Sequence, residues 1–239
     1  MHNRQQKGKR NMSQNVLVVH GGGPTAVINA SLYGVIEEAK RNPEVGKVYG
    51  AIGGTGAIFS ETFIDLTSFN DEKLKLLLHT PASAIGSSRY PLYEKDYEKM
   101  VDIFKKHDIK YVLLNVGNGT MDACGHIYEV CNDQDIKVVG IPKTIDNDIA
   151  MTDHSPGYGS AARFIAASTQ EVGEDVKSLP IHVCIMEAMG RNAGWITAAS
   201  ALARRKQGDA PHLIYLPERN FNEDEFLEDV AALQKKQGG

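Results

Sequence analysis

The chain has 239 residues, of which 42% are hydrophobic and 23% charged, and its formal net charge is −4. This is the ordinary composition of a soluble globular protein with one large domain or two small ones. No apolar run approaches the ~20 residues that a membrane helix needs, and the mild acidity gives little support to a nucleic-acid partner. We therefore expect neither a membrane nor a nucleic acid as partner. Cys124, Cys131 and Cys184 lack C-x-x-C spacing, which predicts free thiols in a reducing cytoplasm.

Residues 1–14 are polar and basic without the apolar core of a signal peptide, and we expect a disordered tail. Beyond it, strand and helix patterns alternate. The expected strands are residues 15–20, 47–52, 110–116, 136–141, 182–186 and 212–218. The expected helices are residues 26–41, 71–79, 94–107, 121–130, 160–179, 195–204 and 223–236. This alternation predicts an α/β fold with a parallel sheet and right-handed crossovers.

Glycine-rich turns at residues 21–25 and 117–120 each join an expected strand to an expected helix. Such a turn presents backbone N–H groups and a helix N-terminus to an anion, and two of them side by side would form a wide phosphate cradle. Neither turn is a Walker loop. Because no G-x-G-x-x-G is followed by an acidic ribose residue, a Rossmann dehydrogenase is disfavoured. The candidate phosphate contacts of these turns are Gly22, Gly23, Gly117, Gly119 and Thr120.

Arg89 stands in a loop beside Gly86, Ser87 and Ser88. An arginine among small residues can form two parallel hydrogen bonds to a phosphate, since nothing bulky blocks the approach. The alternative is a solvated loop arginine.

An acidic loop, P-K-T-I-D-N-D at residues 142–148, follows a β-branched run at residues 138–141 that we expect to be hidden from water in a sheet. The loop then leaves the carboxyl edge of that sheet, where ligands bind in open α/β folds. One of its carboxylates can act as a base and the other can hold a metal, while the lysine can neutralise an anion. Helix-capping aspartates are the alternative interpretation.

This loop resembles the signature loop of the phosphofructokinase family, and its lysine resembles the pyrophosphate-dependent branch. Two further blocks match in family order: G-S-S-R-Y-P at residues 86–91 and M-G-R-N-A-G-W at residues 189–195. The likeness spans residues 15–226. It implies a parallel-sheet αβα sandwich in two lobes, with residues 15–150 binding the phosphoryl donor and residues 151–239 forming an incomplete sugar-phosphate lobe. It further implies a cytoplasmic enzyme of glycolysis that is a homo-oligomer when full length.

The implied reaction is phosphoryl transfer from pyrophosphate to the 1-hydroxyl of fructose 6-phosphate, with Mg²⁺. By the resemblance, Asp146 is the general base, and Arg191 stabilises charge on the transferring group. Thr144 orients the hydroxyl or bridges it to the donor. Asp148 holds Mg²⁺, with Asn118 contacting a metal-bound water. The implied donor-phosphate contacts are Gly22, Gly23, Arg89, Gly117, Gly119, Thr120 and Lys143. The implied sugar-phosphate contacts are Thr144, Ile145, Asp146, His182, Met189, Gly190 and Arg191, although His182 could equally be a structural histidine.

The sequence leaves the donor and the activity open. Lys143 can neutralise one phosphate of pyrophosphate and fill the space that the α-phosphate of ATP needs, which favours pyrophosphate. Gly119 leaves room for a nucleotide, so an ATP-dependent 6-phosphofructokinase is the alternative. Asn118 replaces an aspartate of many members, and Val116 replaces a glycine. Asn118, together with the expectation that the chain stops short of a complete second lobe, motivates a third hypothesis. In it the chain is non-catalytic: a regulatory or structural subunit, or a truncated product that binds sugar phosphate without turnover.

Overall fold

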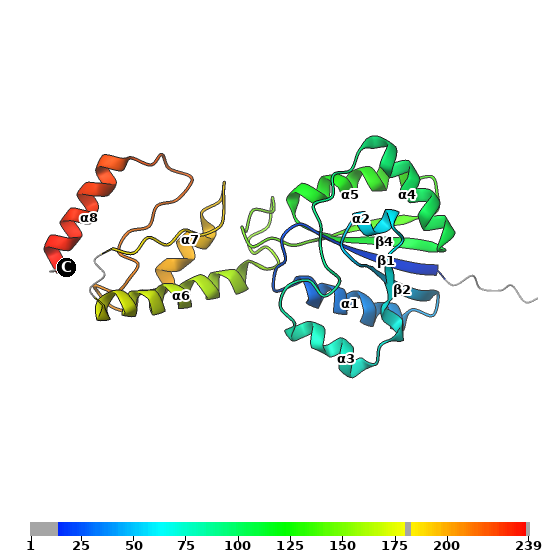
Figure 1. Cartoon of the computed structure of the whole chain (residues 1–239), viewed down its shortest axis with the longest axis horizontal. Helices are drawn as coiled ribbons and strands as arrows, with labels where there is room; N and C mark the ends of the chain where they lie inside the picture. Colours follow the sequence, from blue (N-terminus) through cyan, green and yellow to red (C-terminus); the bar gives the residue numbers. More distant parts are fainter. Residues whose placement is uncertain (1–13, 180–182, 238–239) are drawn as a thin grey trace, which may run out of the picture. The chain divides into compact units, whose positions relative to one another are not determined.

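The computed structural model describes residues 14–179 and 183–237, so most of the expected tail and His182 lie outside the described residues. Contacts divide the chain into two compact units, Met1–Pro142 and Lys143–Gly239, called here the first and second units (Figure 1). We expected the boundary after residue 150. The division by contacts comes at Pro142 because the strand that ends there pairs within the first sheet, whereas Thr144 bridges to Gly157 in the second unit. The assignment of residues 15–150 and 151–239 to a donor lobe and a sugar-phosphate lobe stays a prediction.

The first unit is built on a five-stranded sheet with the order β3-β2-β1-β4-β5. Its strands are β1 (Gln14–Gly21), β2 (Val45–Ala51), β3 (Phe63–Asp65), β4 (Ile109–Val116) and β5 (Lys137–Pro142). All neighbouring pairs are parallel except β2–β3. The expected α/β fold is confirmed. The burial expected of residues 138–141 is wrong for Val139, which is 51% exposed, because β5 is an edge strand in the described sheet.

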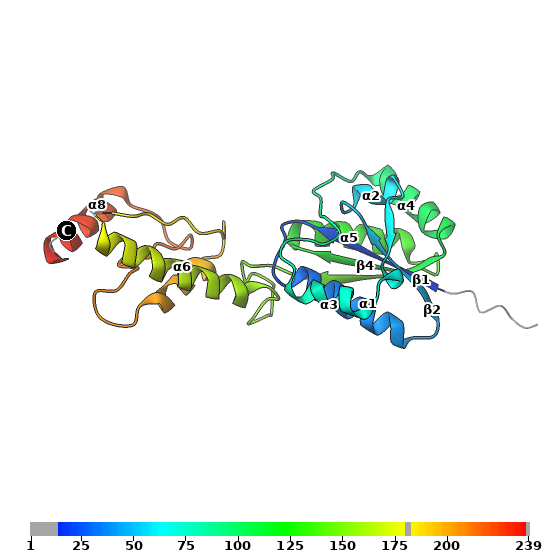
Figure 2. The same ribbon diagram turned by 60° about the horizontal axis from the view of Figure 1, so that its bottom comes forward.

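Helices cover both faces of this sheet, and Figures 1 and 2 show α2, α4 and α5 on one face and α1 and α3 on the other. These elements are α1 (Ile28–Arg41), α2 (Gly56–Phe59), α3 (Asp71–Lys75), α4 (Glu94–Lys106) and α5 (Asn118–Cys131), with 3₁₀ turns at Leu66–Ser68 and Leu76–His79. Along β1, Val16 and Val18 join the core on the α1 side, whereas Leu17 and Val19 join the core on the α4 and α5 side. Burial on both faces explains the unbroken apolar run of this strand.

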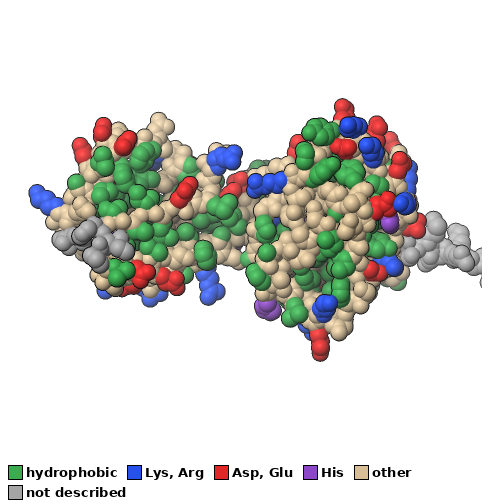
Figure 3. All heavy atoms as spheres, viewed as in Figure 1, with side chains coloured by type: hydrophobic (Ala, Val, Ile, Leu, Met, Phe, Trp, Pro, Cys, Tyr) green, Lys and Arg blue, Asp and Glu red, His purple; other side chains and the backbone are tan. Residues whose placement is uncertain are grey.

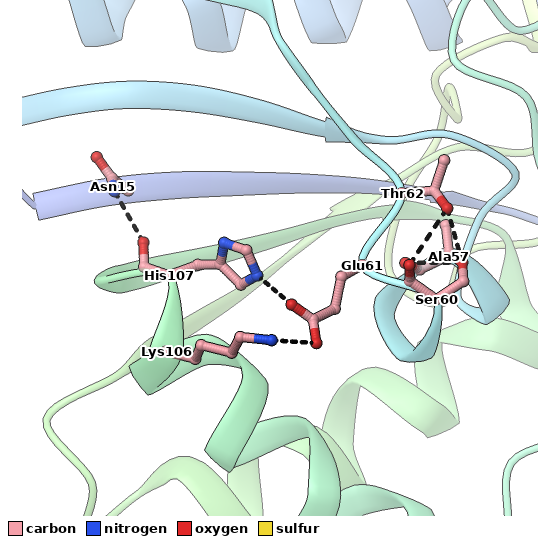
Figure 4. Close-up of polar contacts among 7 residues, drawn as sticks. All are labelled: Asn15, Ala57, Ser60, Glu61, Thr62, Lys106 and His107. Atoms are coloured by element: carbon pink, nitrogen blue, oxygen red, sulfur yellow. Dashed lines mark hydrogen bonds and ion pairs between the residues drawn. The ribbon is translucent and has the colours of Figure 1, made fainter.

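Glu61, in the loop before β3, contacts two residues at the end of α4 (Figure 4). Its carboxylate lies 2.7 Å from Lys106 Nζ and 2.6 Å from His107 Nε2. The His107 ring packs edge-on against Phe63, and its backbone carbonyl accepts a hydrogen bond from Asn15 Nδ2 at 2.8 Å. Hydrogen bonds from Lys106 and then His107 hold the pKa of Glu61 below its ordinary value. Asn15 and His107 lie at the amino ends of β1 and β4, whereas Glu61 precedes Phe63, which pairs with Ala51 at the carboxyl end of β2.

The second unit contains α6 (Tyr158–Ser178), α7 (Trp195–Ala199), a 3₁₀ turn (Ser200–Ala203) and α8 (Glu223–Gln237). The expected strands at residues 183–186 and 212–218 are wrong for the described residues. A β-strand requires ladder hydrogen bonds to a neighbouring strand, and neither segment has such a neighbour in the described part of the chain. Both segments instead line an apolar cavity of about 500 Å³ together with α6 and α8. Figure 3 shows apolar side chains on the surface of this unit. Phe164 and Ile185 are large apolar residues of this unit that are exposed.

Among the described helices, none combines the length and the apolar character that crossing a bilayer would require.

Candidate active site

The two glycine-rich turns lie next to each other at the carboxyl edge of the first unit's sheet. Gly21, the last residue of β1, is paired with Val116, the last residue of β4. A Cβ atom added to Gly21 would lie 2.7 Å from Thr120 Cγ2 and 3.0 Å from Val116 Cγ1. The structure therefore brings the two expected halves of the phosphate cradle into direct contact.

The second of these turns begins α5. Gly117 is its N-cap residue, and the N–H groups of Thr120 and Met121 donate to Gly117 O at 3.1 and 3.0 Å. The first turn of the helix thus starts at Asn118 and Gly119, at the end of the helix dipole that favours an anion. A Cβ atom added to Gly119 or Gly23 would have no atom within 4 Å. The space beside these two glycines is therefore open to an approaching ligand.

The loop that carries Arg89 lies against the first glycine turn. Gly22 N donates to Ser88 O at 3.3 Å, and Ser87 Oγ donates to Gly22 O at 2.6 Å. Arg89 itself is exposed. The predicted donor-phosphate residues of the first unit therefore all lie along one edge of its sheet. Lys143, the remaining predicted contact, belongs to the second unit.

Gly54 and Thr55 also belong to this edge, although the sequence analysis did not select them. A Cβ atom on Gly54 would lie 2.6 Å from Ser88 N and 2.8 Å from His20 O, and its φ of +77° suits glycine alone. Thr55 is buried, and its Oγ1 lies 3.2 Å from Ser88 Oγ. The signal that could have found them is the glycine run at residues 53–56, directly after a strand.

The acidic loop in the second unit is closed by Thr144. Thr144 Oγ1 donates to Asp148 Oδ1 at 3.0 Å and accepts from Asp146 N at 3.0 Å. The carboxylates of Asp146 and Asp148 and the hydroxyl of Thr144 therefore lie together in one short turn.

Asn147 holds this turn in place, a role that the sequence analysis missed. It is buried with φ of 57°, a left-handed conformation that asparagine tolerates better than most residues. Its Nδ2 donates to Asp153 O at 3.2 Å and its Oδ1 accepts from Ser155 N at 2.7 Å. The asparagine between the two aspartates is therefore an internal brace of the loop.

The electrostatic environment distinguishes the two aspartates. Asp146 Oδ1 is buried and has no hydrogen-bond partner among the described residues. Burial, and secondly the nearby charge of Asp148, raise the pKa of Asp146. A carboxylate with a raised pKa accepts a proton more readily, as a general base requires. Lys143 is only 3% exposed, a depth at which lysine is rarely found unless its charge is compensated.

A second loop, at residues 189–195, precedes α7. Gly190 has φ of +118°, and a Cβ atom there would overlap Ala193 O, so the turn requires glycine. Gly194 N donates to Glu218 Oε1 at 2.7 Å. Glu218 was missed as a site residue because the sequence analysis placed it at the end of an expected strand.

Contacts at the start of α6 link this second loop to the acidic loop. Thr144 bridges to Gly157, and the next residue, Tyr158, donates through its hydroxyl to Trp195 O at 3.2 Å. Met189 and Arg191 are exposed, and Ile145 is half-buried in the acidic loop. That Asp146 and Arg191 face each other across a gap sized for substrate stays a prediction.

The sequence of this chain is similar to those of known proteins. The family described as Phosphofructokinase matches residues 15–239. The pyrophosphate--fructose 6-phosphate 1-phosphotransferase of Halomonas elongata is 40% identical over 235 residues, covering 94% of this chain and 56% of the relative. The ATP-dependent 6-phosphofructokinase of Histophilus somni (strain 2336) is 27% identical over 221 residues, covering 92% of this chain and 64% of the relative.

Among solved structures, the pyrophosphate-dependent phosphofructokinase from Marinobacter aquaeolei superimposes with a TM-score of 0.85 at 39% identity. That match covers 94% of this chain and 58% of the other. The chain therefore spans little more than half the length of these pyrophosphate-dependent relatives.

Proposed function

This chain belongs to the phosphofructokinase family, and we propose that it carries the donor-phosphate edge and the catalytic loop of a pyrophosphate-dependent phosphofructokinase. The reaction is transfer of a phosphoryl group from pyrophosphate to the 1-hydroxyl of fructose 6-phosphate, giving fructose 1,6-bisphosphate and phosphate. The observation that carries the proposal is the turn in which Thr144 hydrogen-bonds with both Asp146 and Asp148, where one buried oxygen of Asp146 has no partner within the described part of the chain.

In this mechanism Asp146 takes the proton of the 1-hydroxyl as that oxygen bonds to phosphorus. The bond from phosphorus to the bridging oxygen of pyrophosphate breaks, and the bridging electrons leave with the released phosphate. Phosphoryl transfer asks the protein chiefly for positioning and charge neutralisation. Thr144 orients the hydroxyl, and Arg191 stabilises charge on the transferring group. Met189 and Gly190 contact the sugar phosphate through their backbone.

Mg²⁺ is the metal that we propose for this site. It prefers carboxylate and phosphate oxygens and keeps several waters, so one or two protein carboxylates suffice. Asp148, which is exposed and shares its turn with Asp146, fits that preference, and the neutral amide oxygen of Asn118 fits a contact to a bound water. When bound, the ion would neutralise charge on the donor phosphates.

Lys143 supports pyrophosphate as the donor. A positive charge ~4 Å from a phosphate oxygen is worth a few kcal/mol at an effective dielectric near ~20. The identity of 40% to a pyrophosphate-named relative, against 27% to an ATP-named one, points the same way. ATP is the second candidate, favoured by the open space beside Gly119. We place the protein in the cytoplasm, as a homo-oligomer when the chain is full length.

A coupled assay for fructose 1,6-bisphosphate, run with pyrophosphate and with ATP in parallel, tests the proposal. We expect turnover with pyrophosphate and its loss in Asp146→Asn. Turnover with ATP alone would reverse the donor assignment. Turnover with neither donor, while fructose 6-phosphate still raises the melting temperature, would instead support a non-catalytic sugar-phosphate-binding chain.

A further inference from the structure

A buried polar network lies beneath the loop that carries Arg89. His20, the penultimate residue of β1, is completely buried, and its Nδ1 lies 2.7 Å from Ser83 Oγ. Ser83 Oγ donates to Gly86 O at 2.6 Å, and Gly86 N donates back to Ser83 O at 3.1 Å. The His20 side chain therefore holds the turn at residues 83–86, three residues before Arg89.

Counting hydrogens decides which His20 nitrogen donates. A serine hydroxyl has one hydrogen, and that of Ser83 is used by Gly86 O. Nδ1 of His20 must therefore carry the hydrogen that Ser83 Oγ accepts. His20 Nε2 lies 3.5 Å from Asn115 Nδ2, which donates to Ile28 O at 2.8 Å. The hydrogen bond between His20 and Ser83 therefore runs from Nδ1 to Oγ.

Asn29, in the first turn of α1, anchors the approach to the same turn. It is completely buried, and its Nδ2 donates to Thr80 O and Ala82 O, both at 2.9 Å. Its Oδ1 accepts from Ala84 N at 2.8 Å. Hydrogen bonds with two buried side chains, those of His20 and Asn29, therefore fix the loop along residues 80–86, which lead to Arg89.

We propose that His20 is a positioning residue for the donor phosphate. Through Ser83 it fixes the turn at residues 83–86, and that turn places Ser87 and Ser88 against Gly22 and orients the backbone before Arg89. A binding loop that is already ordered loses less conformational freedom when its ligand arrives. This inference rests on the proposed role of the sheet edge in binding pyrophosphate. His20 touches no reacting atom and acts on donor affinity, not on the chemical step.

Three variants test this role. His20→Leu removes the N–H group that donates to Ser83, and Ser83→Ala removes the hydroxyl that accepts this hydrogen bond. Because Ser83 is a half-buried loop residue, we do not expect Ser83→Ala to unfold the protein. His20→Asn is the conservative variant, because its Nδ2 can take the place of Nδ1 and donate to Ser83. Ser60→Ala is the control, because Ser60 is exposed and its Oγ lies 3.4 Å from Ala57 O and 2.8 Å from Thr62 Oγ1, both within its own loop.

Two measurements separate a positioning role from a merely structural one. Amide hydrogen exchange at Ala84 and Gly86 reports on the loop itself, and calorimetry with magnesium pyrophosphate reports the donor Kd. We expect His20→Leu and Ser83→Ala each to speed exchange and to raise Kd about tenfold, the effect of leaving a buried hydrogen-bonding group unpaired. His20→Asn and Ser60→Ala should stay near wild type. In a preparation that turns over, KM for pyrophosphate should rise while kcat at saturation holds.

Each outcome bears on the proposal. The double variant His20→Leu/Ser83→Ala should change exchange and Kd by less than the sum of the two single variants, because both remove the hydrogen bond between His20 and Ser83. Ser83→Ala also removes the hydrogen bond from Ser83 Oγ to Gly86 O, so the double variant should resemble Ser83→Ala. Unchanged exchange and Kd in Ser83→Ala would overturn the inference, whatever the fate of His20→Leu. Faster exchange with an unchanged Kd would also overturn it. If the wild-type protein binds no pyrophosphate while exchange still responds to the variants, the proposed function is wrong. His20 would then order the loop without any role in binding pyrophosphate, and this inference would be overturned as well.

Discussion

Gly21→Ala tests how closely the two glycine-rich turns pack. The added methyl would lie 2.7 Å from Thr120 Cγ2 and 3.0 Å from Val116 Cγ1, both well inside van der Waals contact. Gly21 is buried and Val116 belongs to an interior strand of the sheet, so Val116 cannot easily move away from the added methyl. Overpacking of a core typically costs about 1–3 kcal/mol. We expect Gly21→Ala to lower the free energy of unfolding by that amount, which is roughly 5- to 150-fold in the equilibrium constant.

Urea denaturation followed by circular dichroism measures this change. Gly23→Ala is the matched control, because a Cβ atom there would have no atom within 4 Å, and its effect should stay within about 0.5 kcal/mol. Thr120→Ser removes Cγ2 and leaves Oγ1, which lies 3.2 Å from the added methyl. The double variant Gly21→Ala/Thr120→Ser should therefore recover part of the lost stability. Equal stability of Gly21→Ala and Gly23→Ala would refute the reasoning.

Four further predictions can be checked on the same protein. Asp146→Asn should reduce turnover by about 10²–10⁴-fold in a coupled assay while fructose 6-phosphate still raises the melting temperature; an unchanged rate would remove Asp146 as the base. Lys143→Gly should raise KM for pyrophosphate, and improved use of pyrophosphate would contradict the donor assignment. Because the folded-state pKa of Glu61 is depressed below its ordinary value, its contribution to stability is present above the unfolded pKa and is lost as the pH falls through the folded one. The difference in unfolding free energy between wild type and Glu61→Gln should therefore shrink as the pH falls below about 4.5, and a constant difference from pH 6 to pH 3 would argue against that ion pair. Burial raises the pKa of Cys131 to about 11, so a thiol reagent at pH 8 should label the exposed Cys184 first, as peptide mass mapping would show.

Local sequence pattern was sufficient for most of the first unit. The apolar run of β1 predicted a strand buried on both faces, and the helical pattern at residues 26–41 predicted most of α1, because both signals depend on neighbours along the chain. The glycine turns were predictable for the same reason, since each follows a strand and opens a helix. β3 was not expected because three residues are too few to show a period.

In the second unit, local pattern predicted strands that the described residues do not form. Residues 183–186 and 212–218 have apolar, β-branched side chains suited to a sheet, yet a strand also needs a partner placed beside it. Chain length and apolar content carry no information about where that partner lies. The helical patterns of α6 and α8 were more reliable, because a helix satisfies its backbone within its own segment.

For the site, the sequence by itself determined which chemical groups are present: two turns with bare backbone amides, an arginine among small residues, and a lysine followed by two aspartates. Only the tertiary structure decided their setting. The close approach of Gly21 to Thr120, the hydrogen bond between His20 and Ser83, and the hydrogen bond from Ala84 N to Asn29 Oδ1 each join residues more than fifty positions apart. The raised pKa of Asp146 likewise depends on burial. Such properties arise from packing between distant segments, and no local pattern encodes them.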